Sequence, residues 1–168
     1  MNAGTGEGDV SSVIIWADAV SPGGREVRLS GGEMEFGYRK SIFQNNDWLI
    51  VRAAFRITEA DRQKTLNEID RIWKRRKKLY PMDFPTAGSV FMNPEGAHAG
   101  RLIEQAGCRG LRLGGAEVSE KHGNFIVNRN NASPDDILRL IEIVRERVSR
   151  KFGITLELEQ EIMGGGSD

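Results

Sequence analysis

A serine in a segment rich in glycine and proline is the first residue of this sequence that could do chemistry. Ser89 stands in "PTAGSVFMNP", residues 85–94, directly after Gly88 and between Pro85 and Pro94. A glycine–serine pair that enters a strand between two prolines is typical of a rigid loop that a ligand can approach closely, although an ordinary serine turn has the same composition. No GxSxG nucleophile elbow surrounds this serine and no triad is apparent. The residues alone leave open what the hydroxyl does.

Three sets of charged residues could act together with this serine. The run "KRRKK", residues 74–78, puts five positive charges at the end of a predicted helix, where it is either a solvated helix end or a phosphate site. Arg39 follows an aromatic residue in "FGYRKS" and is a surface cation unless a partner converges on it. Glu157, Glu159 and Glu161 share one side of the last predicted strand, and a solvated face is their default reading. Spacing alone does not choose between surface and site.

The elements that must position these residues fall into two halves, and the first half is dominated by strands. Residues 1–12 are rich in glycine and serine and are predicted to form a loop. Residues 13–20 and 25–30 predict a hairpin, Ser30–Glu33 has capping-box spacing, and residues 48–57 predict a further strand. A helix is predicted from Thr58 to about Lys78, with Pro81 as its stop.

The second half predicts a β-α-β-β-α-β order. Strands are expected at 89–91, 111–118, 124–128 and 154–162, with a helix at 98–107. The last helix has Ser133 as N-cap, Pro134 at its first position and Gly153 at its end. The fold class is therefore predicted to be α+β, with a layer of helices on a small sheet.

Composition narrows the class of protein. The 168 residues contain 24 Lys and Arg and 24 Asp and Glu, so the formal net charge is zero and no global basic field indicates nucleic acid or a membrane surface as partner. A single cysteine, Cys108, excludes an intramolecular disulfide and is predicted to be a buried apolar filler. With no signal peptide or long apolar run, these features fit a reducing cytoplasm. No metal site is predicted.

Several segments occur in the order that is typical of one protein family: "MNAGTGEG", "FGYRKSIF", "RRKKLYPMDFPTAGSVFMNPEG", "AGRLIEQAG", "LRLGGAEVSEKHGNFIVN" and "KFGITLELE". Over residues 1 to about 164 the sequence resembles the UDP-N-acetylenolpyruvoylglucosamine reductases, the flavoenzymes of peptidoglycan precursor synthesis. The combination of "YRxS", "AGSVFxNP" and "GGAxVSEKH" is highly specific.

The resemblance implies an activity and its catalytic residues. Reduced FAD would pass a hydride to C3 of UDP-N-acetylglucosamine enolpyruvate to give UDP-N-acetylmuramate, with NADPH as the reductant of the flavin. By their place in the family motifs, Ser89 would donate a proton to C2, Arg39 would hold the substrate carboxylate, and Glu159 would assist charge development. Because this chain reads "EQEIMG" where the family commonly has "EVRIIG", a register slip of two would make Glu161 the glutamate instead.

The resemblance also implies ligand contacts. Asn93 would bind the nucleotide sugar. Arg75, Lys77 or Lys78 would replace basic residues that the family often has at the positions of Leu79 and Met92. The flavin contacts within this chain would be Asn2, Ala3 and Gly4. For Lys121 and His122 the motif suggests no role, and a structural histidine is expected.

The family's domain organisation predicts how this chain is divided. Residues 1–80 would be the C-terminal part of the FAD-binding domain, 81–152 the substrate-binding domain, and 153–168 a strand that returns to a missing first domain. In the family the glycine-rich pyrophosphate loop precedes "MNAG", so the chain is expected to be a C-terminal fragment that binds no flavin and is inactive alone, with the missing domain as its partner. The alternative is a non-catalytic UDP-sugar-binding fragment without flavin.

Overall fold

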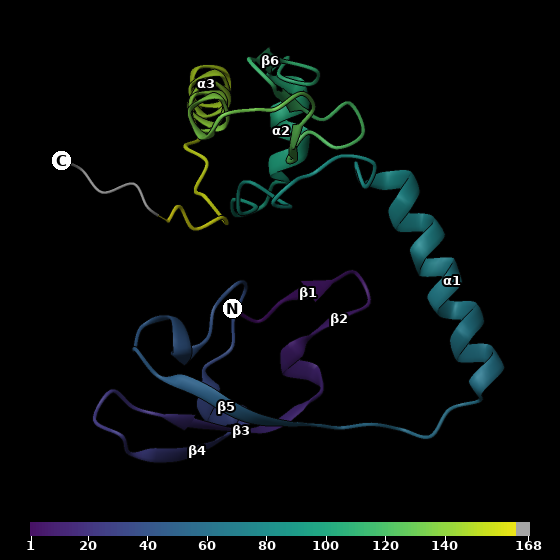
Figure 1. Ribbon diagram of the computed structural model, residues 1–168, viewed down its shortest axis with the longest axis vertical. Coiled ribbons are helices and arrows are strands. Elements are labelled where there is room, and N and C mark those ends of the chain that lie inside the picture. Colours follow the sequence, from purple (N-terminus) through teal and green to yellow (C-terminus); the bar gives the residue numbers. More distant parts are fainter. Residues whose placement is uncertain (164–168) are drawn as a thin grey trace. The chain divides into compact units, whose positions relative to one another are not determined.

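A computed structural model of the protein describes residues 1–163, which divide into two units, Met1–Asp61 and a second unit that begins at Arg62 (Figure 1). Both contain helix and sheet, so the mixed class predicted from the sequence is confirmed. Within residues 1–163 no helix combines the length and the apolar character that crossing a membrane requires.

The first unit is built on a three-stranded antiparallel sheet of order β4-β3-β5, formed by β3 (Ile14–Val20), β4 (Glu26–Ser30) and β5 (Leu49–Phe55). The predicted hairpin is confirmed, with Ala17 of β3 opposite Leu29 of β4. Ala17 and Leu29 pack with Met34 into a small core. The capping box is also confirmed, because the N–H of Ser30 donates to Glu33 Oε2 at 2.9 Å at the start of a 3-10 helix, Gly31–Met34.

The first residues differ from the prediction. A loop was expected, but β1 (Gly4–Thr5) and β2 (Gly8–Asp9) pair as a short antiparallel hairpin. The difference has a physical reason, since the side chain of Asn2 holds the hairpin by hydrogen bonds to Asp9 and to the main chain of Ser11. The periodic pattern of apolar and polar residues does not predict such side-chain contacts.

The second unit contains α1 (Arg62–Leu79), α2 (Ala99–Gln105), α3 (Pro134–Phe152) and a sheet of order β6-β7-β8, formed by β6 (Arg112–Leu113), β7 (Ala116–Val118) and β8 (Ile126–Asn128). Helices α2 and α3 contact each other, and α3 contacts β6 and β7. The core between them includes Phe91, Ile103, Cys108 and Leu140, so Cys108 is buried as predicted.

Helix α3 follows the prediction closely because its signals are local. The N–H of Asp136 donates to Ser133 Oγ at 3.1 Å, and the N–H of Ser133 donates to Asp136 Oδ2 at 2.9 Å. Gly153 ends the helix with φ 69°, in the left-handed region that favours glycine. Helix α1, by contrast, begins at Arg62, later than the predicted Thr58.

The first and last strands predicted for this unit are reduced to single bridges. Ser89 bridges Phe125 and Phe91 bridges Leu158, each in antiparallel sense. On the side that faces Asn124, the main chain of Phe91 hydrogen-bonds the side chain of that residue, so the pairing between Ser89 and Phe125 does not continue as a ladder. The segment predicted to return to another domain, 153–168, extends beyond the described residues.

Candidate active site

Ser89 lies in a loop that is held on one side by the segment before β8. It is half-buried, it bridges Phe125, and the N–H of Val90 donates to the carbonyl of Asn124 at 3.0 Å. Gly88 has φ 90°, a conformation that lets the chain bend just before the serine. These contacts hold the loop in place through main-chain hydrogen bonds, and the rigidity that the composition indicates stays a prediction.

Glu159 lies on the other side of the same loop. Its N–H donates to the carbonyl of Val90 at 2.9 Å, and Gln160 Nε2 donates to the carbonyl of Gly88 at 3.3 Å. Glu159 is half-buried, whereas Glu161 is exposed. The structure therefore brings Ser89 and Glu159 onto adjacent segments, and this arrangement favours Glu159 over Glu161 as the glutamate of the site.

Arg39 belongs to the first unit and occupies a tight turn. Gly37 and Lys40 exchange two main-chain hydrogen bonds of 3.1 and 3.2 Å, which leaves Tyr38 and Arg39 at the corner. Arg39 has φ 52°, a left-handed conformation that is unfavourable for a side chain of this kind. Such strain is concentrated at functional sites, which supports a role for Arg39. That Arg39 converges with Ser89 stays a prediction.

Asn2 is 8% exposed and is used within the first unit. Its Nδ2 donates to Asp9 Oδ2 at 3.1 Å and to the carbonyl of Gly37 at 3.2 Å, and its Oδ1 accepts the N–H of Ser11 at 2.9 Å. Asn2 therefore ties the first hairpin to the turn that carries Arg39. A hydrogen bond from Ser11, followed by one from Asn2, lowers the pKa of Asp9 below its usual value.

Ala3 and Gly4 lie in the same hairpin. The carbonyl of Ala3 accepts the N–H of Val10 at 3.1 Å, and Gly4 pairs with Asp9. A Cβ atom added at Gly4 would lie 2.9 Å from Asp9 Cβ, so the close approach of the two strands requires glycine. Any contact of these two residues with a cofactor would involve main-chain atoms or the Ala3 methyl group.

The residues predicted to bind the nucleotide lie at different places in the second unit. Asn93 Oδ1 accepts the N–H of Ala99 at 3.0 Å and so caps the first turn of α2. Arg75 and Lys78 lie on α1, and both are exposed. The structure thus gives Asn93 a structural bond, and the ligand roles of Asn93, Arg75 and Lys78 all stay predictions.

An aromatic cluster joins the basic end of α1 to the Ser89 loop. The ring of Tyr80 lies 5.4 Å from that of His122 and 5.3 Å from that of Phe125, the bridge partner of Ser89. The guanidinium of Arg76 lies 5.5 Å from the Tyr80 ring. Burial, the main cause, lowers the pKa of His122, and its Nδ1 accepts the N–H of Asn124 at 3.2 Å. His122 is therefore a structural histidine, as expected.

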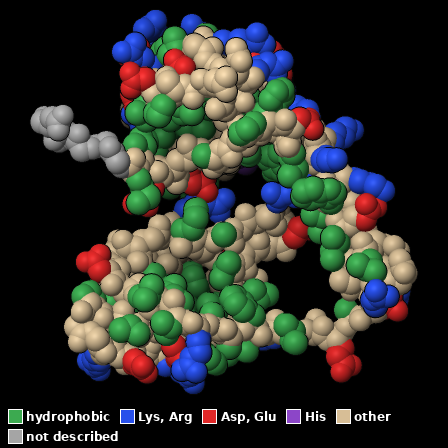
Figure 2. All heavy atoms as spheres, in the orientation of Figure 1, with side chains coloured by type: hydrophobic (Ala, Val, Ile, Leu, Met, Phe, Trp, Pro, Cys, Tyr) green, Lys and Arg blue, Asp and Glu red, His purple; other side chains and the backbone are tan. Residues whose placement is uncertain are grey.

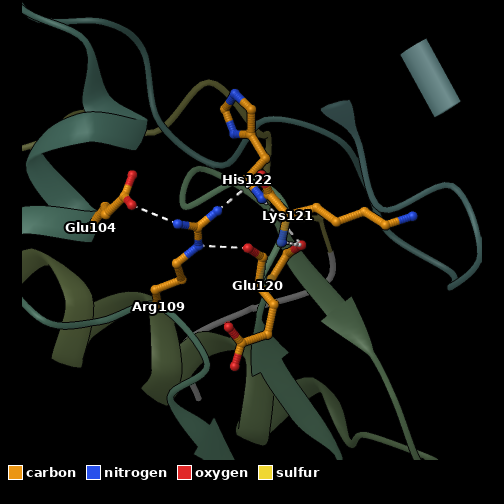
Figure 3. Close-up of polar contacts among 6 residues, drawn as sticks. Glu104, Arg109, Glu120, Lys121 and His122 are labelled. Carbon is orange, nitrogen blue, oxygen red and sulfur yellow. Dashed lines mark hydrogen bonds and ion pairs between the residues drawn. The ribbon is translucent and has the colours of Figure 1, made fainter. Parts of the chain in front are cut away.

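Two residues that shape the site were missed by sequence reasoning. Arg109 donates to the carbonyls of Glu120 and Lys121 and forms an ion pair with Glu104 of α2 (Figure 3). Asn124 hydrogen-bonds the main chain of Phe91. The only available signal was that both lie in or near "GGAEVSEKHGNF", whose individual roles the pattern does not reveal.

Comparisons with known proteins give the same family description over nearly the whole chain. Residues 80–163 match the protein-family model described as "UDP-N-acetylenolpyruvoylglucosamine reductase, C-terminal domain". The UDP-N-acetylenolpyruvoylglucosamine reductases of Pseudothermotoga lettingae and Clostridium novyi are 45% identical over 163 residues and 39% identical over 168 residues, covering 96% and 100% of this chain. The chain spans 57% and 55% of these two relatives' lengths.

A solved structure is similar as well. The crystal structure of UDP-N-acetylenolpyruvylglucosamine reductase (MurB) from Thermus caldophilus matches with a TM-score of 0.80 and 34% identity. That match covers 96% of this chain and 57% of the other.

Proposed function

The chain belongs to the UDP-N-acetylenolpyruvoylglucosamine reductase family, and on that premise we propose that it carries the proton-donating part of such an enzyme's active site. The substrate would be UDP-N-acetylglucosamine enolpyruvate, reduced to UDP-N-acetylmuramate for peptidoglycan synthesis in the cytoplasm. The observation that carries the proposal is the position of Ser89 and Glu159 on adjacent segments, joined by the hydrogen bond from the N–H of Glu159 to the carbonyl of Val90. Arg39 would complete the site.

Each proposed role follows from the chemistry of its side chain. A hydroxyl is a weak acid, but Ser89 would protonate a strongly basic carbanion or enolate at C2, so the mismatch in acidity is small. The planar guanidinium of Arg39 can hold a carboxylate through two parallel hydrogen bonds, which strengthen as negative charge grows. Glu159, half-buried beside the serine loop, would assist charge development around the same enol.

The residues of this chain that were predicted to contact FAD do not make a flavin site by themselves. The side chain of Asn2 is occupied by Asp9, Ser11 and Gly37, and the carbonyl of Ala3 is bonded to Val10. A pyrophosphate needs a set of main-chain N–H groups, such as a glycine-rich turn at the start of a helix. We therefore derive no step through the flavin and assign its binding, with NADPH as reductant, to further polypeptide.

Exposed apolar side chains support the need for that polypeptide. In β5 of the first unit Leu49 is 68% exposed, and Val51 and Phe55 are about half exposed. Figure 2 shows hydrophobic side chains gathered on the surface of this sheet. In the second unit Ile69 and Trp73 of α1 are similarly exposed. Apolar patches and a bare strand edge are typical of docking surfaces, so the proposed partner is the part of the family's length that this chain does not span.

The state of the flavin distinguishes the proposed enzyme part from the alternative, a UDP-sugar-binding module without redox chemistry. We expect the purified chain, mixed with FAD and passed over a sizing column, to lack the flavin absorbance near about 450 nm. Co-expression with the unmatched part of the Pseudothermotoga lettingae relative should give a yellow complex. A colourless complex would favour the binding module, and stoichiometric flavin on the chain alone would contradict the assignment of flavin binding to a partner.

Nucleotide binding is expected to depend on the basic end of α1. UDP-N-acetylglucosamine should bind weakly and lose affinity as salt rises, because an exposed diphosphate–cation contact is screened. Lys78→Ala and Arg75→Ala should each weaken binding, while Lys64→Ala, at the other end of α1, serves as the matched control. Calorimetry at several salt concentrations would measure this. No heat at millimolar ligand, or equal loss in all three variants, would contradict the proposed site.

A further inference from the structure

We propose that Asn124 is a positioning residue that holds the Ser89 loop and Glu159 in register, an inference that rests on the proposed function for its catalytic meaning. Asn124 is 5% exposed and precedes β8. Its side chain and main chain together bind the two residues that follow Ser89. It would touch neither substrate nor cofactor and would act through Val90 and Phe91.

The side-chain amide of Asn124 makes the two hydrogen bonds with the Phe91 main chain that a neighbouring strand would otherwise make. The N–H of Phe91 donates to Asn124 Oδ1 at 3.0 Å, and Asn124 Nδ2 donates to the carbonyl of Phe91 at 2.8 Å. Phe91 is 1% exposed, so neither of its main-chain groups has water as a ready substitute partner. An amide side chain offers one acceptor and one donor side by side in this way, whereas an ionised carboxylate offers acceptors alone.

The main chain of Val90 connects Asn124 to Glu159 through two hydrogen bonds. Its N–H donates to the carbonyl of Asn124 at 3.0 Å, and its own carbonyl accepts the N–H of Glu159 at 2.9 Å. The residue directly after Ser89 is therefore fixed by Asn124 on one side and fixes Glu159 on the other. A shift of Asn124 would move both proposed catalytic residues.

Asn124 is itself held by a loop that is packed against α2. A Cβ atom added at Gly123 would lie 2.7 Å from the carbonyl oxygen of Gly100, and one added at Gly100 would lie 3.1 Å from His122 Cε1. Arg109 fixes the same loop through the carbonyls of Glu120 and Lys121 (Figure 3). This anchoring leaves the loop little freedom to adapt if the amide of Asn124 is removed.

Hydrogen exchange on the chain tests the inference without relying on activity. In Asn124→Ala the amide of Phe91 should exchange at least about tenfold faster, while amides in the middle of α3 keep their rates. Asn128→Ala is the matched control, because Asn128 Oδ1 accepts a local bond, from the N–H of Ala132 at 3.0 Å. Unchanged protection of Phe91, or equal loss throughout the second unit, would overturn the proposal.

Asn124→Asp gives a second test in case the alanine variant fails to fold. An ionised carboxylate can still accept the Phe91 N–H, but it cannot donate to the Phe91 carbonyl and repels that oxygen, which opens the paired arrangement. A protonated carboxyl can donate, so it reproduces the amide pattern. After correction for intrinsic exchange, protection of the Phe91 amide should be lost near neutral pH and return as the pH falls. The wild-type chain should show no such return, and protection that is independent of pH in this variant would count against Asn124 as the donor.

The catalytic consequence is measured in the flavin-containing complex. A displacement of about 1 Å can slow a reaction on the order of a hundredfold, so Asn124→Asp should lower kcat for substrate reduction with little change in KM, and low pH should restore part of the rate. Changed exchange with an unchanged kcat would overturn the positioning role. If Ser89→Ala is also without effect, the proposed function of the loop fails as well, which separates the two failures.

Discussion

Replacing Ser89 with alanine is expected to slow reduction of the enolpyruvyl substrate by about 10² to 10⁴ while leaving the reduction of flavin by NADPH nearly unchanged. The two half-reactions differ because only the second requires a proton at C2. Ser89→Cys should keep part of the activity, since a thiol is a better acid than a hydroxyl but is longer and softer. Stopped-flow absorbance of the flavin in the reconstituted complex would measure both steps separately.

A second hydroxyl in the same loop provides the control. Thr86 Oγ1 donates to the carbonyl of Ile126 at 2.7 Å and so has a structural role. Thr86→Val should lower stability without changing the ratio of the two half-reactions. If Ser89→Ala slowed both half-reactions equally, Ser89 would be a structural loop residue and the proposed proton transfer would be wrong.

The largest expected effect on stability comes from Gly115, in the turn between β6 and β7. Its carbonyl accepts the N–H groups of Arg129 and Asn130 at 2.9 and 3.2 Å. A Cβ atom added there would lie 2.7 Å from Ala132 Cα and closer still to the Asn130 carbonyl oxygen and the Ala132 nitrogen. These are main-chain atoms that cannot rotate away. Gly115→Ala should therefore lower the free energy of unfolding by about 3 kcal/mol or more.

Thermal unfolding of the second unit, followed by circular dichroism, would measure this loss as a fall in Tm of more than about 10 °C. Gly107→Ala is the control, because Gly107 has φ 72° and nothing within 4 Å of an added Cβ atom. It should lose only about 1 kcal/mol through backbone strain. Equal losses in the two variants would show that the structure relieves the collision at Gly115, which would contradict the prediction.

Features that depend on neighbours along the chain could be predicted without the structure. Ser133, Asp136 and Gly153 specify both ends of α3, and the residues around "SPGG" specify the β3–β4 hairpin, because caps and turns act within a few residues. The family motifs are also short segments that can be recognised in the sequence, and the comparisons confirm the family that they indicated. Ser89 and Glu159 entered the candidate site in that way.

How these residues come together depends on the packing of distant segments, which local patterns do not encode. The bond between Val90 and Glu159 joins segments that are distant in sequence. Residues 89–91 were predicted to pair as a strand, but the main chain of Phe91 binds the side-chain amide of Asn124. Asn2 and Asn93, whose ligand contacts stay predictions, also have partners inside the protein that no sequence pattern indicates. Such bonds depend on which loops come into contact after packing. The periodic pattern of apolar residues predicts helices and strands, but it does not predict the partner of a side-chain amide.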